Sequence, residues 1–261
     1  MLKNLLQGSV LGMYAALFGL LLLLAFVVTH QMHWPVLGVY RYDALLAYAL
    51  IIQLFLVYFK LETWREVWVI AIFHIMAMGM ELFLTHPKIG SWHYPEDAIF
   101  RIANVPLFAG FMYSAVGSFL ARGLRLFRIS FIHLPDLRGL GVLAMLSYAN
   151  FFTKFFVPDI RNLLFAASVI LFWKTRIYLQ LKQQVYGLAF LPLLLGLAFI
   201  VWLSENIATF ANIWRYPSQA ELWHMVGWGK LGSWYLLLTL SLVLVLAVMG
   251  KREASGKWQL H

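Results

Sequence analysis

Two acidic residues stand in stretches of sequence that are otherwise almost entirely apolar. Glu81 and Glu205 each lie near the end of a long apolar run, and each is followed four residues later by a threonine and then by Trp-x-Tyr-Pro. An ionisable residue inside a membrane-spanning helix usually faces the bundle interior and marks a site for a substrate or an ion. Two carboxyl groups that meet away from water do not both ionise cheaply, so one would hold a proton beside the other. The pair therefore indicates general acid–base chemistry.

The match between the two stretches extends beyond the glutamates. The matching pairs are Glu81 and Glu205, Thr85 and Thr209, Trp92 and Trp214, Tyr94 and Tyr216, Pro95 and Pro217, Gly110 and Gly232, and Tyr113 and Tyr235. Each copy covers an apolar run, a loop and the next run, and the copies are four runs apart, so they share one orientation. We therefore predict two parallel four-helix repeats, residues 1–137 and 138–261, related by a pseudo-twofold axis along the membrane normal.

The composition sets the class of protein that carries these repeats. Of the 261 residues, 62% are apolar and only 12% are charged, which is too few charges to cover a soluble domain of this size. The apolar runs are long enough to cross a hydrocarbon layer of roughly 30 Å, and helices satisfy their own backbone polar groups there. We predict an all-α polytopic membrane protein. Its eight spans would lie near residues 9–29, 43–59, 66–85, 102–121, 139–156, 161–173, 185–210 and 224–248.

Lysine and arginine are distributed unevenly between the two sides that eight spans create. The side with both termini carries thirteen: Lys3, Lys60, Arg65, Arg122, Arg125, Arg128, Arg138, Lys174, Arg176, Lys182, Lys251, Arg252 and Lys257. The other side carries six: Arg41, Lys88, Arg101, Lys154, Arg161 and Arg215. Because basic loops stay in the cytoplasm, we predict a multi-pass protein of the bacterial inner membrane with cytoplasmic N- and C-termini. The net charge of +9 then reflects contact with the lipid bilayer, and we expect no nucleic-acid partner.

Further polar residues near the two glutamates are candidates for the same site. His74, two turns before Glu81 on the same helix face, would relay protons to Glu81 or be a hydrogen-bonded packing residue. Thr85 and Thr209 should line the same cavity. The aromatic candidates are Trp92, Tyr94, Tyr113, Trp214, Tyr216 and Tyr235. They would form an aromatic belt at the membrane surface, or they would line a substrate pocket and stabilise a carbocation with their π faces.

Lys230 is the one cation well inside a late apolar run. It would snorkel to water, pair with Glu205 or Glu81, or form a Schiff base with a retinal-type ligand. His86 and His93 raise the alternative of a metal held together with His74 and Glu81, but the clustered histidine boxes of membrane di-iron desaturases are absent. The sequence has no cysteine, which excludes thiolate metal sites and iron–sulfur clusters. We expect neither a metal nor an organic cofactor.

The segments MELFLTHPKIGSWHYPE and NVPLFAGFMYSAVGSF resemble a family of uncharacterised bacterial integral membrane proteins, the YoaT-like family (domain of unknown function 817). More remotely, Glu81, the loop through Tyr94 and Val105-Pro106 are similar to the core motif of the carotenoid-modifying membrane enzymes. These are the bisanhydrobacterioruberin hydratases and the heterodimeric-type lycopene cyclases. That resemblance implies that Glu81 is an intramembrane acid, and that long polyenes are modified by protonation without a redox cofactor.

The residues and the resemblance favour one hypothesis over its alternatives. The leading hypothesis is a non-redox enzyme of lyase or isomerase type that uses Glu81 and Glu205 as acid and base on an apolar isoprenoid or lipid substrate. The alternatives are a proton-coupled transporter of a small amphipathic molecule, a ligand-binding protein that uses Lys230, and a membrane scaffold. A transporter needs polar residues in both halves of the membrane, whereas here they cluster in the outer half, which favours an enzyme.

Reporter fusions test the predicted topology. A reporter fused after Lys60 or after Lys182 should indicate the cytoplasm, and one fused after Tyr94 should indicate the outside, because the basic loops are retained on the side of the termini. A cytoplasmic result after Tyr94 would contradict both the topology and an outward-facing site.

Overall fold

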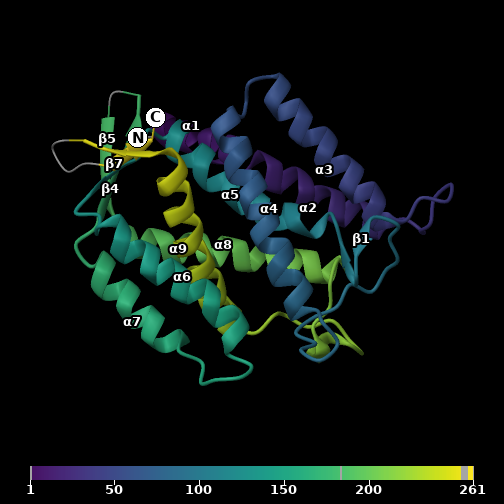
Figure 1. Cartoon of the computed structure of the whole chain (residues 1–261). Helices are drawn as coiled ribbons and strands as arrows, with labels where there is room; N and C mark the ends of the chain where they lie inside the picture. The colour runs from purple at the N-terminus through teal and green to yellow at the C-terminus, as the bar shows by residue number, and fades with distance from the viewer. Residues whose placement is uncertain (1, 183, 254–257, 261) are drawn as a thin grey trace.

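The structure, a computed structural model, describes residues 2–182, 184–253 and 258–260. It is a bundle of helices with a small antiparallel sheet at one end (Figure 1). The helices are α1 (Leu2–Ala15), α2 (Leu17–His30), α3 (Arg41–Tyr58), α4 (Trp64–Leu84), α5 (Ala109–Leu126), α6 (Leu137–Thr153), α7 (Arg161–Phe172), α8 (Phe190–Phe210) and α9 (Gly229–Met249), with a 3-10 helix η1 at Pro217–Gln219. The strands are β1 (Arg101–Ile102), β2 (Val105–Pro106), β3 (Ser130–Ile132), β4 (Arg176–Leu181), β5 (Gln184–Ala189), β6 (Gly250–Arg252) and β7 (Trp258–Leu260).

Four of the described helices, α3, α4, α8 and α9, are long and apolar enough to cross a membrane. The pair α1 and α2, bent by 70° at a short break, makes a fifth if it counts as one span. The runs predicted at 102–121, 139–156 and 161–173 fall on α5, α6 and α7. However, α7 has only 12 residues, α6 has 17, and α5 carries two arginines near its end. The structure thus has four or five candidate spans, and the predicted eight are not confirmed.

The sheet corrects the prediction of an all-helical chain. Its strands follow the order β5-β4-β3-β7-β6, and all neighbours are antiparallel. The segment RIYLQL of β4 alternates polar and apolar residues, as half-buried strands do. β5 takes up the start of the run predicted as a span at 185–210, so α8 begins only at Phe190. The hairpin of β1 and β2 likewise delays the start of α5 to Ala109. Lys257, part of the charge bias, lies outside the described residues.

Buried ion pairs hold the start of α4 against the end of α5. The Thr63 hydroxyl accepts a hydrogen bond from the backbone of Glu66, whose carboxylate accepts one from the Thr63 backbone, and this capping box starts α4. Glu66 also pairs with Arg125 at 2.9 Å, and Glu62 pairs with Arg122 at 2.5 Å. Both glutamate side chains are fully buried. Because losing one partner would leave a buried charge uncompensated, these pairs fix the register of the two helices.

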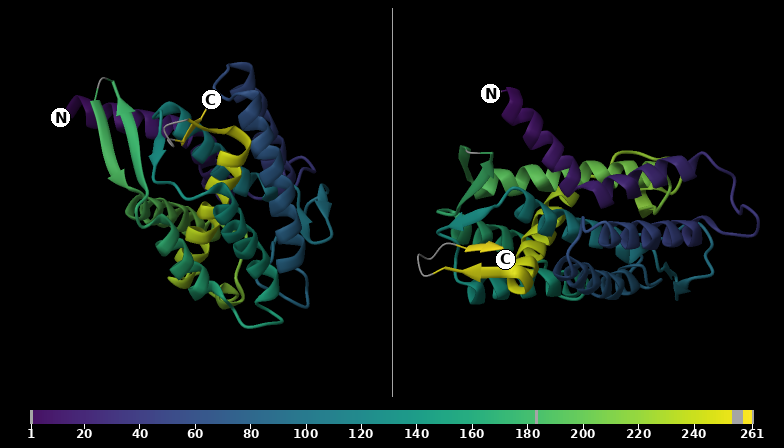
Figure 2. Two further views of the ribbon diagram at one scale, coloured as in Figure 1. Left: turned by 60° about the vertical axis from the view of Figure 1, so that its left-hand side comes forward. Right: turned by 90° about the horizontal axis from the view of Figure 1, so that it is seen from above.

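At the other end of the bundle, the start of α3 holds the two Trp-x-Tyr-Pro loops. The Arg41 guanidinium pairs with Glu96 at 2.6 Å in the first loop and donates to the carbonyl of Ala211 at 2.8 Å. The Tyr42 hydroxyl donates to the carbonyl of Ile213 at 2.9 Å, just before the second loop. One turn of α3 therefore anchors both loops, which lie at the end of the molecule opposite the sheet (Figures 1 and 2).

Glycines on α5 allow α4 to approach closely. A Cβ atom added at Gly110 would lie 2.5 Å from ring atoms of His74, and one added at Gly117 would lie 2.8 Å from the ring of Phe73. Small residues serve the same purpose at helix contacts of membrane proteins. Because α4 carries Glu81 and α5 carries the predicted partner Tyr113, this contact sets the distance between two residues of the candidate site.

Substitution of one of these glycines tests the close packing. Gly117→Ala should lower the free energy of unfolding by about 1–3 kcal/mol, because overpacking displaces the Phe73 ring. Gly141→Ala in α6 is the matched control, since an added Cβ there meets no atom within 4 Å and alanine favours the helix. Thermal unfolding in detergent, followed by tryptophan fluorescence, measures both variants. Equal midpoints for the two would contradict the packing described.

Candidate active site

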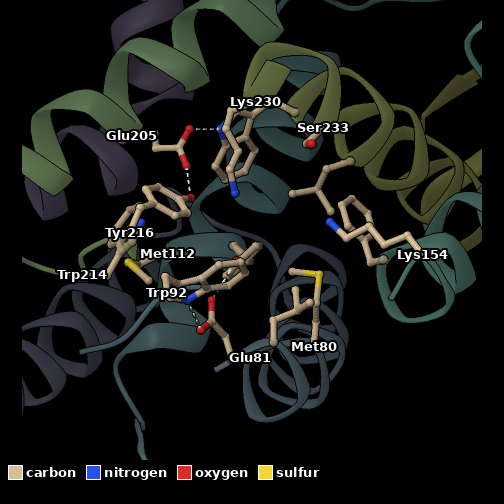
Figure 3. A pocket seen from close by; sticks show the side chains of 15 residues that line it. Met80, Glu81, Trp92, Met112, Lys154, Glu205, Trp214, Tyr216, Lys230 and Ser233 are labelled. Atoms are coloured by element: carbon tan, nitrogen blue, oxygen red, sulfur yellow. Dashed lines mark hydrogen bonds between the residues drawn. The ribbon is translucent and has the colours of Figure 1, made fainter. Parts of the chain in front are cut away.

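The loop-side ends of α4, α8 and α9 border a cavity of about 70 Å³. Its lining consists of Met80, Glu81, Leu84, Trp92, Met112, Tyr113, Phe151, Lys154, Glu205, Trp214, Tyr216, Lys230, Ser233, Trp234 and Leu237. Figure 3 shows Glu81 and Glu205 on two sides of the cavity, with the amine ends of Lys154 and Lys230 directed into it. A water molecule in the liquid occupies about 30 Å³, so the cavity suits one small chemical group rather than a whole lipid.

Three neutral donors converge on Glu81. The indole Nε1 of Trp92 and the hydroxyl of Tyr94 each donate to Oε2 at 2.9 Å, and the hydroxyl of Tyr113 donates to Oε1 at 2.7 Å. Glu81 is only 1% exposed, and it belongs to no ion pair among the described residues. Its carboxyl group is therefore held out of water by hydrogen bonds from uncharged side chains, which satisfy its oxygens without fixing its charge.

Glu205 has a similar but smaller set of donors. The Tyr216 hydroxyl donates to Oε1 at 2.5 Å, and the Trp234 indole Nε1 donates to Oε2 at 2.8 Å. Glu205 is also buried and is free of ion pairs within the described part of the chain. Tyr94 and Tyr216 occupy matching places in the two stretches and bind matching glutamates. The tryptophans differ, because Trp92 comes from a loop and Trp234 from α9.

Lys230 is held by the faces of two aromatic rings. Its Nζ lies 4.1 Å from the ring centroid of Tyr216 and 5.2 Å from that of Trp92, and these two rings meet edge to face, 6.0 Å apart. The side chains that donate their polar edges to the glutamates therefore present their π faces to the ammonium group. Among the described residues, the Lys230 side chain forms neither a hydrogen bond nor an ion pair.

The two Trp-x-Tyr-Pro loops contact each other directly. His93 and Arg215 exchange two backbone hydrogen bonds, 3.0 and 2.9 Å long, in an isolated antiparallel bridge. His93 follows Trp92 and Arg215 follows Trp214, so residues at equivalent places in the two stretches pair with one another. This bridge brings the two loops over one cavity. Duplication of whole units at 1–137 and 138–261 remains a prediction.

A second cavity, of about 160 Å³ and almost wholly apolar, adjoins the first. Its walls come mainly from α2, α5 and α8. Met112, Glu205, Trp214 and Trp234 line both cavities. The Glu205 carboxyl group therefore stands at the boundary between a polar space and one that suits a hydrocarbon chain.

Some predicted residues lie outside the cavity lining. His74 packs against α5, so its ring fills a helix contact. The hydroxyls of Thr85 and Thr209 donate to carbonyls of their own helices at 2.8 and 3.2 Å. Tyr235 shares a hydrogen bond of 2.9 Å with Ser168 and does not reach Glu205. The structure thus gathers the two glutamates and the residues of the two loops, but not these four.

The alternative metal set is also not assembled. No group of three or more histidine, aspartate or glutamate side chains that could hold a metal occurs in the part of the chain that the structure describes. His86 and His93 are exposed in the first loop, whereas Glu81 is buried beneath it.

Two cavity residues, Lys154 and Trp234, were not singled out by the sequence. Lys154 looks like an ordinary basic residue of an outer loop, and no repeat marks it. Trp234 stands beside Tyr235, which the repeat selects. One residue turns the direction of a helical side chain by about 100°, so Trp234 faces Glu205 while Tyr235 faces α7. Only the observation that two aromatic residues adjoin at this point could have suggested Trp234.

The buried glutamates also affect the loop tyrosines. Burial and the neighbouring Glu81 raise the pKa of Tyr94 well above its ordinary value, and burial and Glu205 do the same to the pKa of Tyr216. Both hydroxyls therefore keep their protons throughout the neutral range and act as donors. A proton that moves within the cavity must come from another group.

Substitution of Glu81 tests the hydrogen bonds around it. In Glu81→Gln, the amide oxygen can keep Trp92 and Tyr94 as donors, and the amide nitrogen can donate to the hydroxyl of Tyr113. In Glu81→Leu, buried donors lose their acceptor at a cost of about 1–3 kcal/mol each. We therefore expect Glu81→Gln to change the free energy of unfolding by less than about 1 kcal/mol, and Glu81→Leu to lower it by more than about 3 kcal/mol.

Unfolding in detergent measures both variants, and Glu221→Leu, at an exposed position in the second loop, is the control for the loss of a carboxylate as such. Equal free energies of unfolding for Glu81→Gln and Glu81→Leu would contradict the three hydrogen bonds to this side chain.

Comparison with known proteins gives one family. The model of the family described as "Protein of unknown function (DUF817)" matches residues 4–242. The uncharacterized protein YoaT of Bacillus subtilis (strain 168) is 35% identical over 241 residues, which cover 92% of this chain and 90% of that protein. No solved structure matches. The remote similarity to carotenoid-modifying enzymes is not among these matches and stays a prediction. The match over nearly the whole length confirms the family resemblance, and the chain belongs to the DUF817 family.

Proposed function

We propose that this protein is a membrane enzyme of non-redox type that uses Glu81 and Glu205 as acid and base on an isoprenoid or another lipid. One observation carries the proposal. Two buried carboxyl groups line one small cavity, and each is held by uncharged aromatic donors rather than by a cation. Such an environment leaves each group able to hold or release a proton according to the charge of its neighbour, as an acid–base pair must.

In the proposed reaction, one carboxyl group donates its proton to a carbon–carbon double bond. The other removes a proton from an adjacent carbon, which gives an isomer, or from a water molecule that adds, which gives a hydrated product. Neither course changes the overall oxidation state of the substrate. Positive charge that develops on carbon can be stabilised by π faces. The π faces of Trp92 and Tyr216 are already in contact with the Lys230 ammonium group. The rings of Tyr113 and Trp234, whose centroids lie 6.2 Å apart, offer further π surface for such a charge.

The apolar cavity supports a hydrocarbon substrate. It adjoins Glu205 and measures about 160 Å³, below the roughly 300–1,000 Å³ of sites that enclose a drug-sized ligand. Only the reacting end of a long chain would therefore be enclosed. The remainder would lie along α2 and α8, which expose large apolar side chains such as Leu24 and Ile200.

We also propose a location for the site, in the outer half of a bacterial inner membrane with both termini in the cytoplasm. The charge bias supports this orientation. So does the arrangement of the chain, because its two ends lie near the sheet and the Trp-x-Tyr-Pro loops lie at the opposite end (Figure 1). The pairing of the two loops through His93 and Arg215 supports a parallel duplication as the origin of the paired glutamates.

Mass spectrometry of lipid and pigment extracts tests the function. Cells that express the wild-type protein should contain a lipid that is depleted, and another enriched, relative to cells without the gene. The two masses should be equal or differ by one water molecule, as acid–base chemistry requires. Glu81→Gln and Glu205→Gln should each abolish the difference, because the amide keeps the shape of the carboxyl group and cannot transfer its proton.

Glu221→Gln, which changes an exposed glutamate of the second loop, is the matched control and should behave like the wild type. A mass difference of two hydrogen atoms would indicate redox chemistry and overturn the proposal. Extracts that match the wild type in both cavity variants would overturn it as well.

A further inference from the structure

Two lysine side chains reach into the cavity without an acceptor. The Nζ of Lys154 lies 5.0 Å from the ring centroid of Phe155, and the Nζ of Lys230 lies over Tyr216 and Trp92. Neither side chain makes a hydrogen bond or an ion pair with any residue that the structure describes. An ammonium group carries three donors and no acceptor. Both lysines therefore retain donors for a molecule that enters the cavity.

The charged groups that line the cavity balance one another. Glu81 and Glu205 contribute two negative charges when ionised, and Lys154 and Lys230 contribute two positive charges. The carboxyl oxygens already accept hydrogen bonds from aromatic side chains, whereas the two ammonium groups donate none to the described residues. A bound anion would satisfy them. Its added negative charge would then favour proton uptake by one of the neighbouring carboxylates.

We propose that the cavity binds the carboxylate head of a lipid acid between Lys154 and Lys230, and that this binding draws one proton onto the pair Glu81 and Glu205. The hydrocarbon chain of the acid enters the apolar cavity past Glu205, which then faces the first carbons of the chain. This inference rests on the proposed function and narrows its substrate to an unsaturated lipid acid. The negative charge of the substrate thus draws a proton onto one glutamate, and this protonated carboxyl group is the acid that the reaction needs.

Charge favours a carboxylate over other lipid head groups. A phosphate monoester carries about −1.5 to −2 charges at neutral pH, so it would draw up to two protons onto the pair of glutamates. A neutral hydroxyl adds no charge to the cavity, so it would leave the balance of two carboxylates and two ammonium groups unchanged and would draw no proton onto either carboxylate. A cationic head group would be repelled by both lysines.

The proton can reside only on a few of the groups that face the cavity. The groups in the lining are Glu81 of α4, Tyr113 of α5, Lys154 at the end of α6, Glu205 of α8, Tyr216 of the second loop and Lys230 of α9. Two further groups lie close by: Tyr94, which donates to Glu81, and Arg161, which pairs with Asp159 and whose charge acts on Lys230. An arginine stays charged, and the hydroxyls of Tyr94 and Tyr216 keep their protons in the neutral range. Proton uptake that is lost when both glutamates are changed to glutamine is therefore uptake by a carboxylate, and uptake that persists is uptake by a lysine.

Binding of dodecanoate and dodecanol to the full-length protein in nanodiscs tests the head group, with empty nanodiscs subtracted for partition into lipid. Dodecanoate should bind at least about tenfold more tightly, since a charged hydrogen bond contributes about 1.5–3 kcal/mol. Lys154→Met and Lys230→Met should each weaken dodecanoate binding by about tenfold and leave dodecanol binding unchanged. Lys88→Met, in the exposed first loop, is the matched control.

Equal binding of the acid and the alcohol, unaffected by either lysine variant, would overturn this inference and leave the proposed function intact with a neutral lipid. If neither compound binds, the lipid-acid substrate is ruled out, and the lipid extracts of the Glu81→Gln cells decide separately on the proposed function.

Proton uptake is measured with dodecanesulfonate, whose single negative charge does not titrate. Its binding in weakly buffered solution at neutral pH should remove about one proton per bound molecule, which a pH indicator detects. The double variant Glu81→Gln, Glu205→Gln should bind it without this uptake. Absence of uptake in the wild type, or equal uptake in the double variant, would overturn the proton coupling.

Discussion

The burial of two carboxyl groups at one end of the helix bundle is the constraint on which the other features of the site depend. A carboxyl group away from water must be satisfied by hydrogen bonds, and the helices that carry Glu81 and Glu205 use their own backbone donors internally. The donors must therefore come from other segments: the two loops, α5 and α9. This requirement accounts for the close α4–α5 contact, and for the contacts of Arg41 and Tyr42 that hold the loops in place.

The helices could be predicted because continuous apolar runs of this length have few other stable arrangements in a membrane. The number of helices that span a membrane is less accessible, and the eight predicted spans are not confirmed. Arg122 and Arg125 lie in the last turns of α5, and their partners Glu62 and Glu66 lie about sixty residues away in the sequence. A sequence window does not reveal such pairs. The sheet was missed for a similar reason, because its short strands are stabilised by distant segments, as when Ser130 pairs with Gln259.

The candidate site was only partly accessible from the sequence. The repeated pattern identified both glutamates, and the matching tyrosines Tyr94 and Tyr216 bind them. The matching tryptophans differ, because Trp92 binds Glu81 whereas Trp214 only lines the cavity. The pattern failed where helix geometry decides the outcome. Tyr113 reaches Glu81, whereas its counterpart Tyr235 turns toward Ser168 and leaves Glu205 to Trp234. Lys154 gave no signal, because the burial of a loop lysine depends on which helices close around it.

The two matching stretches differ in their surroundings, and this difference gives the cavity a direction. Glu81 has three donors and lines only the smaller cavity, whereas Glu205 has two and also borders the apolar one. Lys230 is held by Trp92 on the Glu81 side and by Tyr216 on the Glu205 side, so its charge acts on both carboxyl groups. In the proposed reaction, a hydrocarbon chain that enters from the apolar cavity would meet Glu205 first, and Glu81 would exchange protons with Glu205 across the polar cavity. Matching stretches of sequence thus place their glutamates in unequal surroundings, because only Glu205 borders the apolar cavity.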